Sequence, residues 1–188
     1  MEYLLEKINE IHKIGHAAQE ALASKLQKIN LDKGGFLVEE SKTCNRLFFL
    51  ERGSVRGYYN LDGKEITHWF GFESDFITSF YSFITEKPSL ESVQTLETSV
   101  LWAITKKDLI SLYDDYPEIE RFVRMTYEKL YIRLEERYVN AQFKTAKQRY
   151  NDLLDTNPQI IQRVPLGYIA SFLGISQETL SRTRAKPD

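Results

Sequence analysis

The sequence predicts an α+β protein in which an N-terminal helix and an antiparallel β-roll precede a long helix and a small helical domain. Six of the nine glycines lie between Gly34 and Gly71, among short runs rich in Val, Phe, Tyr and Thr. A long amphipathic pattern then begins near Pro117, and two short apolar patterns separated by Gly174 close the chain. We expect the roll to be of the double-stranded β-helix or jelly-roll type.

The beginning of the chain has the apolar spacing of a helix. Leu4, Ile8 and Ile11 recur at three- and four-residue steps, and Leu22 and Leu26 continue the pattern. We therefore predict one helix over roughly the first 29 residues.

The next region predicts strands. The stretch RLFFLERGSVRGYYNLDGKEITHWF is broken at Gly53 and at Asp62-Gly63. Asp-Gly between two strand-forming runs favours a tight hairpin, because both turn positions need a positive φ. SVQTLETSVLWAIT adds further strand-forming residues. Short strands at close spacing favour antiparallel pairing.

The long helix is predicted over Pro117–Phe143, about 27 residues and therefore about 40 Å. Asp114 or Asp115 is the expected N-cap, because acids and proline favour a first turn. The apolar residues of this helix form a stripe that suits a partner helix. The predicted homodimer interface consists of Val123, Tyr127, Leu130, Leu134 and Tyr138.

Composition excludes several classes of protein. The 188 residues contain no run of about 18 apolar residues and no signal-peptide pattern, so we expect no membrane contact. The lone Cys44 fits a reducing compartment, and we predict a cytoplasmic protein. There is no P-loop, nucleophile elbow or pair of catalytic carboxylates, so we expect no enzyme, no catalytic residue and no cofactor. His12 and His16 are one helical turn apart but lack a third ligand, so no metal site is predicted.

The closing segment, YIASFLGISQETLSR, predicts a helix, a glycine turn and a second helix. Gly174 supplies the left-handed residue of the turn, and Ser176 is placed to cap the second helix. In helix-turn-helix proteins the second helix enters the major groove of DNA. Residues 144–188 carry a net charge of +3 against −5 for residues 1–143, which favours an anionic partner for this end. The residues predicted to contact double-stranded DNA are Ser176, Gln177, Glu178, Ser181, Arg182, Arg184 and Lys186.

The order of these elements resembles the Crp–Fnr transcription regulators over almost the whole chain. LFFLERGSVRGYYNLDGKEI is similar to part of that family's cyclic nucleotide-binding domain, and GISQETLSR is similar to its recognition helix. The resemblance implies a sensor roll over residues 1–115, a long dimerisation helix over 116–145 and a helix-turn-helix domain over 146–188. It also implies that RNA polymerase is a partner.

The roll departs from the family at its phosphate cassette. The family's nucleotide sensors carry a Gly-Glu pair followed by Arg and a small residue, where Thr78-Ser79 and Ser89-Leu90 stand here. A phosphate buried without a cation is poorly compensated, so we predict that cyclic AMP does not bind. Two readings of the roll stay open, a filled core and a pocket for a small effector of unknown identity. The candidate pocket residues are Thr78, Ser79, Phe80, Tyr81, Ser89 and Leu90.

The sequence therefore favours a homodimeric, sequence-specific DNA-binding regulator whose roll senses an effector or acts as a scaffold. The alternative is a ligand-binding or protein-interaction module whose vestigial helix-turn-helix no longer binds DNA. One feature supports the alternative: the family usually continues into a wing hairpin, and this sequence lacks a full wing after Lys186.

Overall fold

The structure, a computed structural model, describes residues 1–185. Its N-terminal region contains two helices, α1 (Glu2–Ile11) and α2 (His16–Lys25), so the prediction of one helix over the first 29 residues is wrong. Gly15 has an extended backbone and caps α2, and Asn9 Oδ1 accepts a hydrogen bond of 3.1 Å from the Ile14 N–H. This side-chain hydrogen bond therefore stabilises the break between the two helices. Strand β1 (Gln27–Leu31) then begins where helix was expected.

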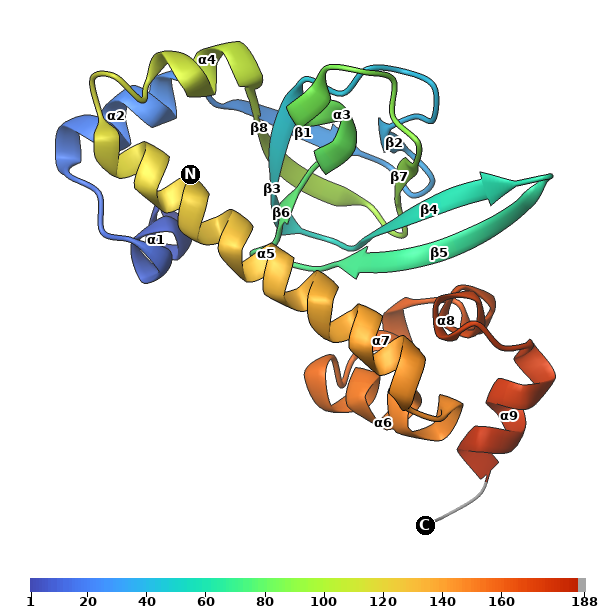
Figure 1. The fold of residues 1–188 in the computed structure, drawn as a ribbon. Helices are drawn as coiled ribbons and strands as arrows, with labels where there is room; N and C mark the ends of the chain where they lie inside the picture. Colours follow the sequence, from blue (N-terminus) through green and yellow to red (C-terminus); the bar gives the residue numbers. More distant parts are fainter. Residues whose placement is uncertain (186–188) are drawn as a thin grey trace.

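Two four-stranded antiparallel sheets form the predicted roll (Figure 1). One sheet has the order β1-β8-β3-β6 and the other has the order β2-β7-β4-β5. The remaining strands are β2 (Phe36–Val38), β3 (Arg46–Arg52), β4 (Val55–Leu61), β5 (Lys64–Gly71), β6 (Phe76–Ile77), β7 (Ser92–Thr95) and β8 (Ser99–Thr105). The short helices α3 (Phe80–Thr85) and α4 (Lys106–Ser111) complete this region.

The hairpin predicted at Asp62-Gly63 is confirmed. It joins β4 to β5, with φ of 52° at Asp62 and 82° at Gly63, as a two-residue turn of this type requires. The pairing register of the two strands shifts between Gly57 and Tyr58, so that His68 is an extra residue opposite them. Such a β-bulge changes the direction in which neighbouring side chains point.

The core between the two sheets is apolar and includes Leu50, Val55, Val93 and Leu101, all almost fully buried. A second cluster joins α1, α2 and α4 to the outer face of β3 and to α5 (Pro117–Phe143). Burial of these faces removes apolar area from water at about 25 cal/mol per Å². The first half of α5 is therefore fixed to the roll.

Helix α5 has the predicted bounds but not the predicted cap. Tyr116 is the N-cap residue and makes no side-chain capping bond, so neither Asp114 nor Asp115 caps the helix. Pro117 occupies the first turn as expected. The helix crosses the molecule diagonally and ends beside the C-terminal helices (Figure 1).

The C-terminal helical unit comprises α6 (Ala146–Thr156), α7 (Ile160–Arg163), α8 (Leu166–Leu173) and α9 (Gln177–Ala185). Each of its four helices contributes to one apolar cluster, which also takes in Leu96 of the roll: Leu96, Tyr150, Leu153, Ile160, Val164, Ile169, Ala170, Leu173 and Leu180. The unit lies beneath the β4–β5 hairpin, with α8 next to β5 (Figure 1).

Candidate functional site

The turn between α8 and α9 has the predicted conformation. Gly174 has φ of 66° and ψ of 32°, and its N–H continues the hydrogen bonding of α8. A Cβ at Gly174 would meet no atom within 4 Å, so the glycine is needed for its backbone angles and not for space. The Thr179 N–H donates to Ser176 Oγ at 3.2 Å, which makes Ser176 the predicted N-terminal cap of α9.

One face of α9 is open to solvent. Leu180 is buried against α8 and fixes the rotation of the helix. Glu178 and Arg182 lie opposite Leu180, and Ser181, Gln177 and Arg184 lie between the two sides. These five residues and the cap residue Ser176 are exposed. Lys186, the remaining predicted DNA contact, lies outside the described residues. The structure therefore places the described members of the predicted set on one surface.

The side chains on this surface are already partly ordered. Arg182 Nη2 lies 3.3 Å from Thr179 Oγ1. The Ser176 hydroxyl holds the pKa of Glu178 below its ordinary value. The side-chain nitrogen of Gln177 lies over Gly167 of α8, where a Cβ would come within 2.5 Å of it. The absence of a side chain at Gly167 thus leaves room for Gln177 beside α8.

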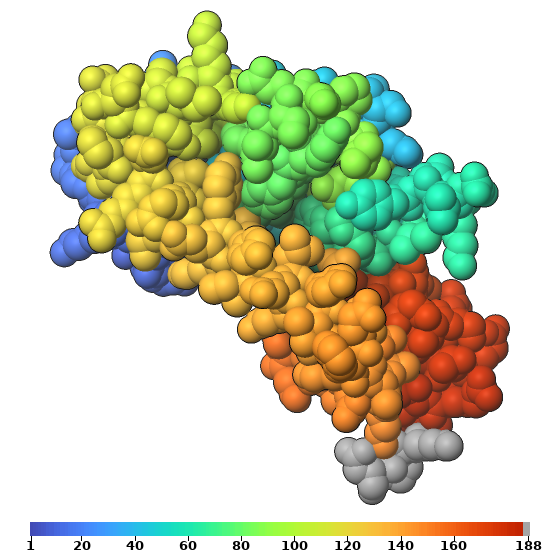
Figure 2. Space-filling view, viewed as in Figure 1, coloured from blue at the N-terminus to red at the C-terminus, as the bar shows by residue number. Residues whose placement is uncertain are grey.

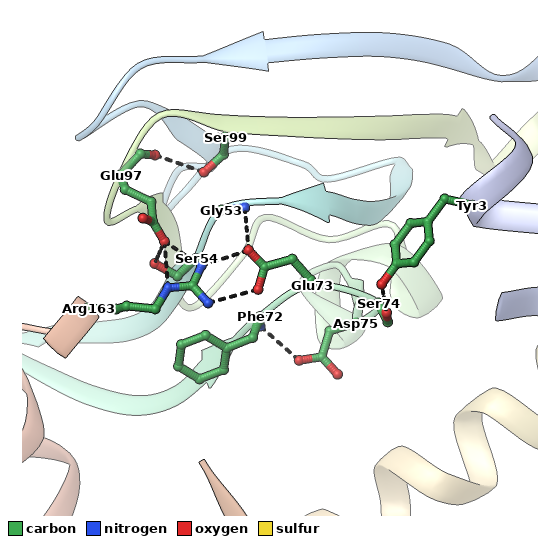
Figure 3. A network of polar contacts seen from close by, with 10 residues as sticks. All are labelled: Tyr3, Gly53, Ser54, Phe72, Glu73, Ser74, Asp75, Glu97, Ser99 and Arg163. Carbon is green, nitrogen blue, oxygen red and sulfur yellow. Dashed lines mark hydrogen bonds and ion pairs between the residues drawn. The ribbon is translucent and has the colours of Figure 1, made fainter. Parts of the chain in front are cut away.

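An ion-pair cluster ties the C-terminal helical unit to the roll (Figure 3). Arg163, at the end of α7, donates to both carboxylate oxygens of Glu73 at 2.7 and 2.8 Å and to Glu97 at 2.6 Å. The Gly53 N–H and the Ser54 hydroxyl donate to the same two carboxylates. Although burial acts in the opposite direction, the hydrogen bonds from Arg163 and Gly53 hold the pKa of Glu73 below its ordinary value.

A second contact between roll and C-terminal unit involves a buried arginine. Arg56 of β4 is 2% exposed, and its guanidinium lies between the rings of Tyr58 and Tyr168, at 4.1 and 3.7 Å from their centres. Its Nη2 donates to Glu65 and Gln94. Its Nε and Nη1 are buried without a hydrogen-bond partner, as is the hydroxyl of Thr67. Orphaned buried donors are rare and costly in folded proteins.

Sequence reasoning missed both of these arginines. Arg163 is 90 residues from Glu73 along the chain, and Arg56 is more than 100 residues from Tyr168. No local spacing connects such partners. The one usable signal was Gly57 next to Arg56, since glycine inside a strand often indicates a bulge or a close approach.

The three hydroxyl side chains of the candidate effector pocket, Thr78, Ser79 and Ser89, form hydrogen bonds within the chain. Ser79 and Ser89 are buried, and Ser89 Oγ lies 2.9 Å from Ser79 Oγ and 2.7 Å from the Glu91 carbonyl oxygen. Thr78 Oγ1 donates to the Arg46 carbonyl. The cassette hydroxyl groups therefore already have partners within the chain.

The apolar members of the candidate pocket point in different directions. Phe80 packs edge-on against Tyr127 of α5, with ring centres 5.4 Å apart. Tyr81 and Leu90 are exposed. The structure thus does not gather the six predicted residues around one cavity, and it favours the reading of a filled roll.

The β-bulge brings two side chains to one carboxylate. His68 Nε2 and Trp69 Nε1 lie 2.7 and 2.8 Å from Glu91 Oε2, and the His68 ring stacks on Tyr59 at 4.2 Å. A Cβ at Gly57 would come within 2.1 Å of the Trp69 indole, so this glycine lets the ring cross β4. Glu91 is buried, His68 and Trp69 are partly buried and Tyr59 is exposed, and the sequence had predicted His68 only as a strand residue.

The predicted dimer stripe on α5 divides into two parts. Val123 is 4% exposed and packs inside the chain's own core, so it cannot belong to a surface seam. Burial raises the pKa of Tyr127 to about 12, which agrees with its contact to Phe80. Leu130 is half-buried, whereas Leu134 and Tyr138 are 58% and 68% exposed. The open seam consists of Leu130, Tyr131, Leu134 and Tyr138. The second half of α5, coloured orange, lies at the surface of the molecule in Figure 2.

Comparison with known proteins identifies the roll. Residues 28–116 match the model of the cyclic nucleotide-binding domain family. The fold of this segment is that of a cyclic nucleotide-binding domain. No curated protein matches the chain in sequence.

Solved structures extend the similarity beyond this domain. FixK2 from Bradyrhizobium japonicum superposes with a TM-score of 0.71 and 18% identity, over 85% of this chain and 83% of that one. CLP, a c-di-GMP responsive global regulator from Xanthomonas campestris, gives 0.69 and 16%, over 90% and 89%. The catabolite activator protein of Thermus thermophilus gives 0.59 and 18%, over 93% and 84%. At these identities the similarity establishes the fold, and the solved structures include a protein assigned to the Crp/Fnr family.

Two further features of the described residues concern the membrane and metal ions. Between residues 1 and 185, no helix has both the length and the apolar character that crossing a bilayer requires. Within the same range, His, Cys, Asp and Glu do not gather in threes in a way that could hold a metal ion. His12 follows α1 and His16 begins α2, so the pair does not share a helix as the sequence suggested.

Proposed function

We propose that this protein is a homodimeric transcription regulator of the Crp–Fnr type that reads double-stranded DNA with α9. One observation carries the proposal: α8, the left-handed Gly174 turn and the capped α9 present a polar surface on the face opposite the buried Leu180. A second helix held in this way is the element that enters the major groove in helix-turn-helix proteins. The regulators with similar structures support the assignment.

The chemistry of α9 suits base recognition. Arg182 can donate two hydrogen bonds to guanine, Gln177 can pair with adenine, and Glu178 can accept from cytosine. Arg184 adds a positive charge for the phosphate backbone, and Ser176 and Ser181 are small donors beside it. These six residues are exposed, and the partners of Arg182 and Glu178, Thr179 and Ser176, lie on α9 itself or at its cap, so contact with DNA would break only local contacts.

The proposed dimer uses the open seam of α5. Leu130, Tyr131, Leu134 and Tyr138 recur at intervals that suit a parallel pairing of two long helices. Two-fold symmetry would place two copies of α9 at half-sites about 34 Å apart, one turn of DNA. Contacts with RNA polymerase follow from the family resemblance alone.

In this proposal the roll does not bind cyclic AMP. The positions of the family's phosphate-binding Glu and Arg are Ser79 and Ser89, which bond to each other. An effector of another kind, or none, is consistent with this cassette.

Titration against pooled genomic DNA fragments at several salt concentrations tests the proposal. Selective enrichment of some fragments, with affinity that falls as salt rises, is the expected result. Equal binding of all fragments, or no binding at low salt, would favour a protein-interaction module that does not read DNA.

A further inference from the structure

Arg149 of α6 bonds to the ends of two other helices. Its Nη1 donates to the Lys144 carbonyl oxygen at 2.6 Å, and its Nη2 donates to the Leu173 carbonyl oxygen at 2.9 Å. Lys144 directly follows α5, and Leu173 is the last residue of α8. One guanidinium therefore joins the end of the long helix to the end of α8, immediately before the Gly174 turn.

These two carbonyl groups suit an arginine. The last four carbonyl groups of a helix have no partner within it, and they form the negative end of the helix dipole. A guanidinium is a planar cation whose separate nitrogen donors have a fixed geometry, so it can bond two carbonyl oxygens at once. Arg149 thus satisfies acceptors that belong to two elements and holds those elements at a fixed distance.

The connection between α5 and α6 is braced by further contacts. Lys144 Nζ donates to Asp152 Oδ2 of α6 at 2.8 Å. Thr145 begins α6 with a complete capping box, in which Gln148 is the second member. The side chain and the carbonyl group of Lys144 are therefore both bonded to α6, and α6 has a defined direction relative to α5.

Helix α9 in turn follows the end of α8. The Ile175 N–H donates to the Ala170 carbonyl oxygen at 3.0 Å across the turn. Leu173 and Leu180 are buried in the same apolar cluster. Because α9 is packed on α8 in this way, a contact that fixes the end of α8 also fixes the direction of α9.

The other contacts of α8 are of a different kind. Ser171 accepts from the Thr67 N–H, and Phe172 packs on Phe70, so these residues hold one side of α8 against the roll of the same chain. The guanidinium of Arg137 in α5 lies 5.4 Å from the centre of the Phe172 ring, without a hydrogen bond between the two side chains. The hydrogen bonds of Arg149 link α8 to the end of α5, the helix assigned to the dimer.

We propose that Arg149 is a positioning residue, which sets the direction of each α9 relative to α5 and thereby the half-site spacing that the dimer accepts. It acts through α8 and reads no base itself. The effect on DNA rests on the proposed function, whereas the position of α9 relative to α5 within one chain is independent of it.

Duplexes that keep the half-sites selected by the natural chain, but change their separation by single base pairs, test the effect on DNA. Each added base pair moves one half-site by about 3.4 Å and turns it by about 35°. One base pair should cost the natural chain about tenfold or more in affinity, and Arg149→Gln only about two- to threefold. The preferred half-site sequence should stay the same, because the residues of α9 are unchanged.

Two further variants separate positioning from charge. Arg149→Lys keeps the charge but has one nitrogen donor in place of two, so its spacing preference should lie between those of the natural chain and Arg149→Gln. Arg121→Gln, at an exposed position of α5, removes a charge elsewhere and should keep the natural preference. If Arg149 only stabilised the fold, Arg149→Gln would lower the melting temperature and keep the natural spacing preference, and that result would overturn the proposal.

Distances between spin labels test the position of α9 without DNA. Labels on Glu136→Cys of α5 and Ser181→Cys of α9 lie at exposed positions, whereas the natural Cys44 is buried. In samples diluted with unlabelled chain, the natural sequence and Arg121→Gln should give one narrow distance distribution, and Arg149→Gln a broader one. Equal distributions for the natural sequence and Arg149→Gln would overturn the proposal. If Arg149→Gln broadens the distribution but no chain binds DNA, the proposed function fails and the positioning of α9 by Arg149 stands.

Discussion

Arg182 is the residue on which the proposed recognition of a particular base depends most directly. It lies one helical turn beyond Glu178 on the open face of α9, and its present partner is the hydroxyl of Thr179. That contact is weak and exposed, so the guanidinium can turn toward a base at little cost. Arg184 lies further along the same helix and is better placed to contact the phosphate backbone of DNA.

Arg182→Ala should therefore weaken binding to the preferred site by about 1–3 kcal/mol and relax the choice of base at one position per half-site. Arg184→Ala, which removes the same charge, should weaken binding to all sequences alike and reduce the salt slope by about one unit per monomer. Affinities on a panel of single-base variants measure both effects. Equal losses for the two substitutions on every sequence would show that Arg182 contacts only phosphate.

The buried Glu91 carboxylate is the central group of its cluster with His68 and Trp69 in the roll. It accepts from His68 and Trp69, and removal of its charge leaves one of these groups with a weaker partner. Glu91→Gln should lower the free energy of unfolding by about 1–3 kcal/mol, as expected for a lost hydrogen bond to a charged group. Urea denaturation measures this, with exposed Glu128→Gln as the control. No difference between the two variants would mean that the carboxylate is not needed.

At the scale of elements, the sequence was enough to predict those features whose determining residues are neighbours in the chain. The Asp62-Gly63 hairpin, the bounds of α5 and the Gly174 turn depend on residues a few positions apart, and each was predicted. The N-terminal break was missed because Gly15 interrupts an otherwise helical pattern, and the break is stabilised by the packing of Ile14 in the core and by the hydrogen bond between Ile14 and Asn9. The predicted N-cap of α5 was wrong because Tyr116 follows the two aspartates and occupies the N-cap position itself.

The seam on α5 makes a separate prediction at this scale. Leu134→Asp should convert a dimer into a monomer, because a pair of such charges in an apolar seam would cost several kcal/mol. Leu134 is 58% exposed in one copy of the chain, so the folded monomer should tolerate the change. Ile132→Asp is the matched control, since Ile132 is 52% exposed but lies on another side of the helix. Sedimentation would contradict the seam if the natural chain were monomeric at micromolar concentration.

The cassette of the roll predicts its response to nucleotide. A ligand at about 100 times its dissociation constant should stabilise a protein by about 2.7 kcal/mol. Because Ser79 and Ser89 bond to each other, we expect millimolar cyclic AMP to leave the melting temperature unchanged. Saturable micromolar binding in calorimetry would show that the chain supplies another cation for the phosphate.

At the scale of the whole molecule, the long-range contacts are what sequence could not predict. The stripe on α5 was assigned to a dimer as one set, yet Val123 belongs to the core that α5 makes with the roll. The domain limits at residues 115 and 145 stay a prediction. The position of the C-terminal unit depends on Arg163, Arg56 and Ser171, whose partners are distant in the chain.

The Arg163 cluster gives this arrangement a pH dependence. The pKa of Glu73 is lowered in the folded chain, so its contribution is fully present above the ordinary Glu value of 4.5 and is lost as the pH falls below it. The Thr67 N–H donates to Ser171 of α8, so its hydrogen exchange should accelerate relative to that of Leu101, in the centre of the other sheet, as the pH falls below about 4.5. Arg163→Gln should remove most of that dependence. An unchanged profile in this variant would assign the acid sensitivity to other carboxylates.

The central claim, that a symmetric pair of α9 helices reads DNA, is tested most directly by selecting binding sites from a pool of random duplexes. The structure predicts that the natural chain enriches a near-palindromic site whose half-sites are about one helical turn, ~34 Å, apart. The Arg182→Ala chain should enrich the same site with one position per half-site relaxed. Enrichment of no common site by the natural chain, or of a single half-site without symmetry, would contradict the claim.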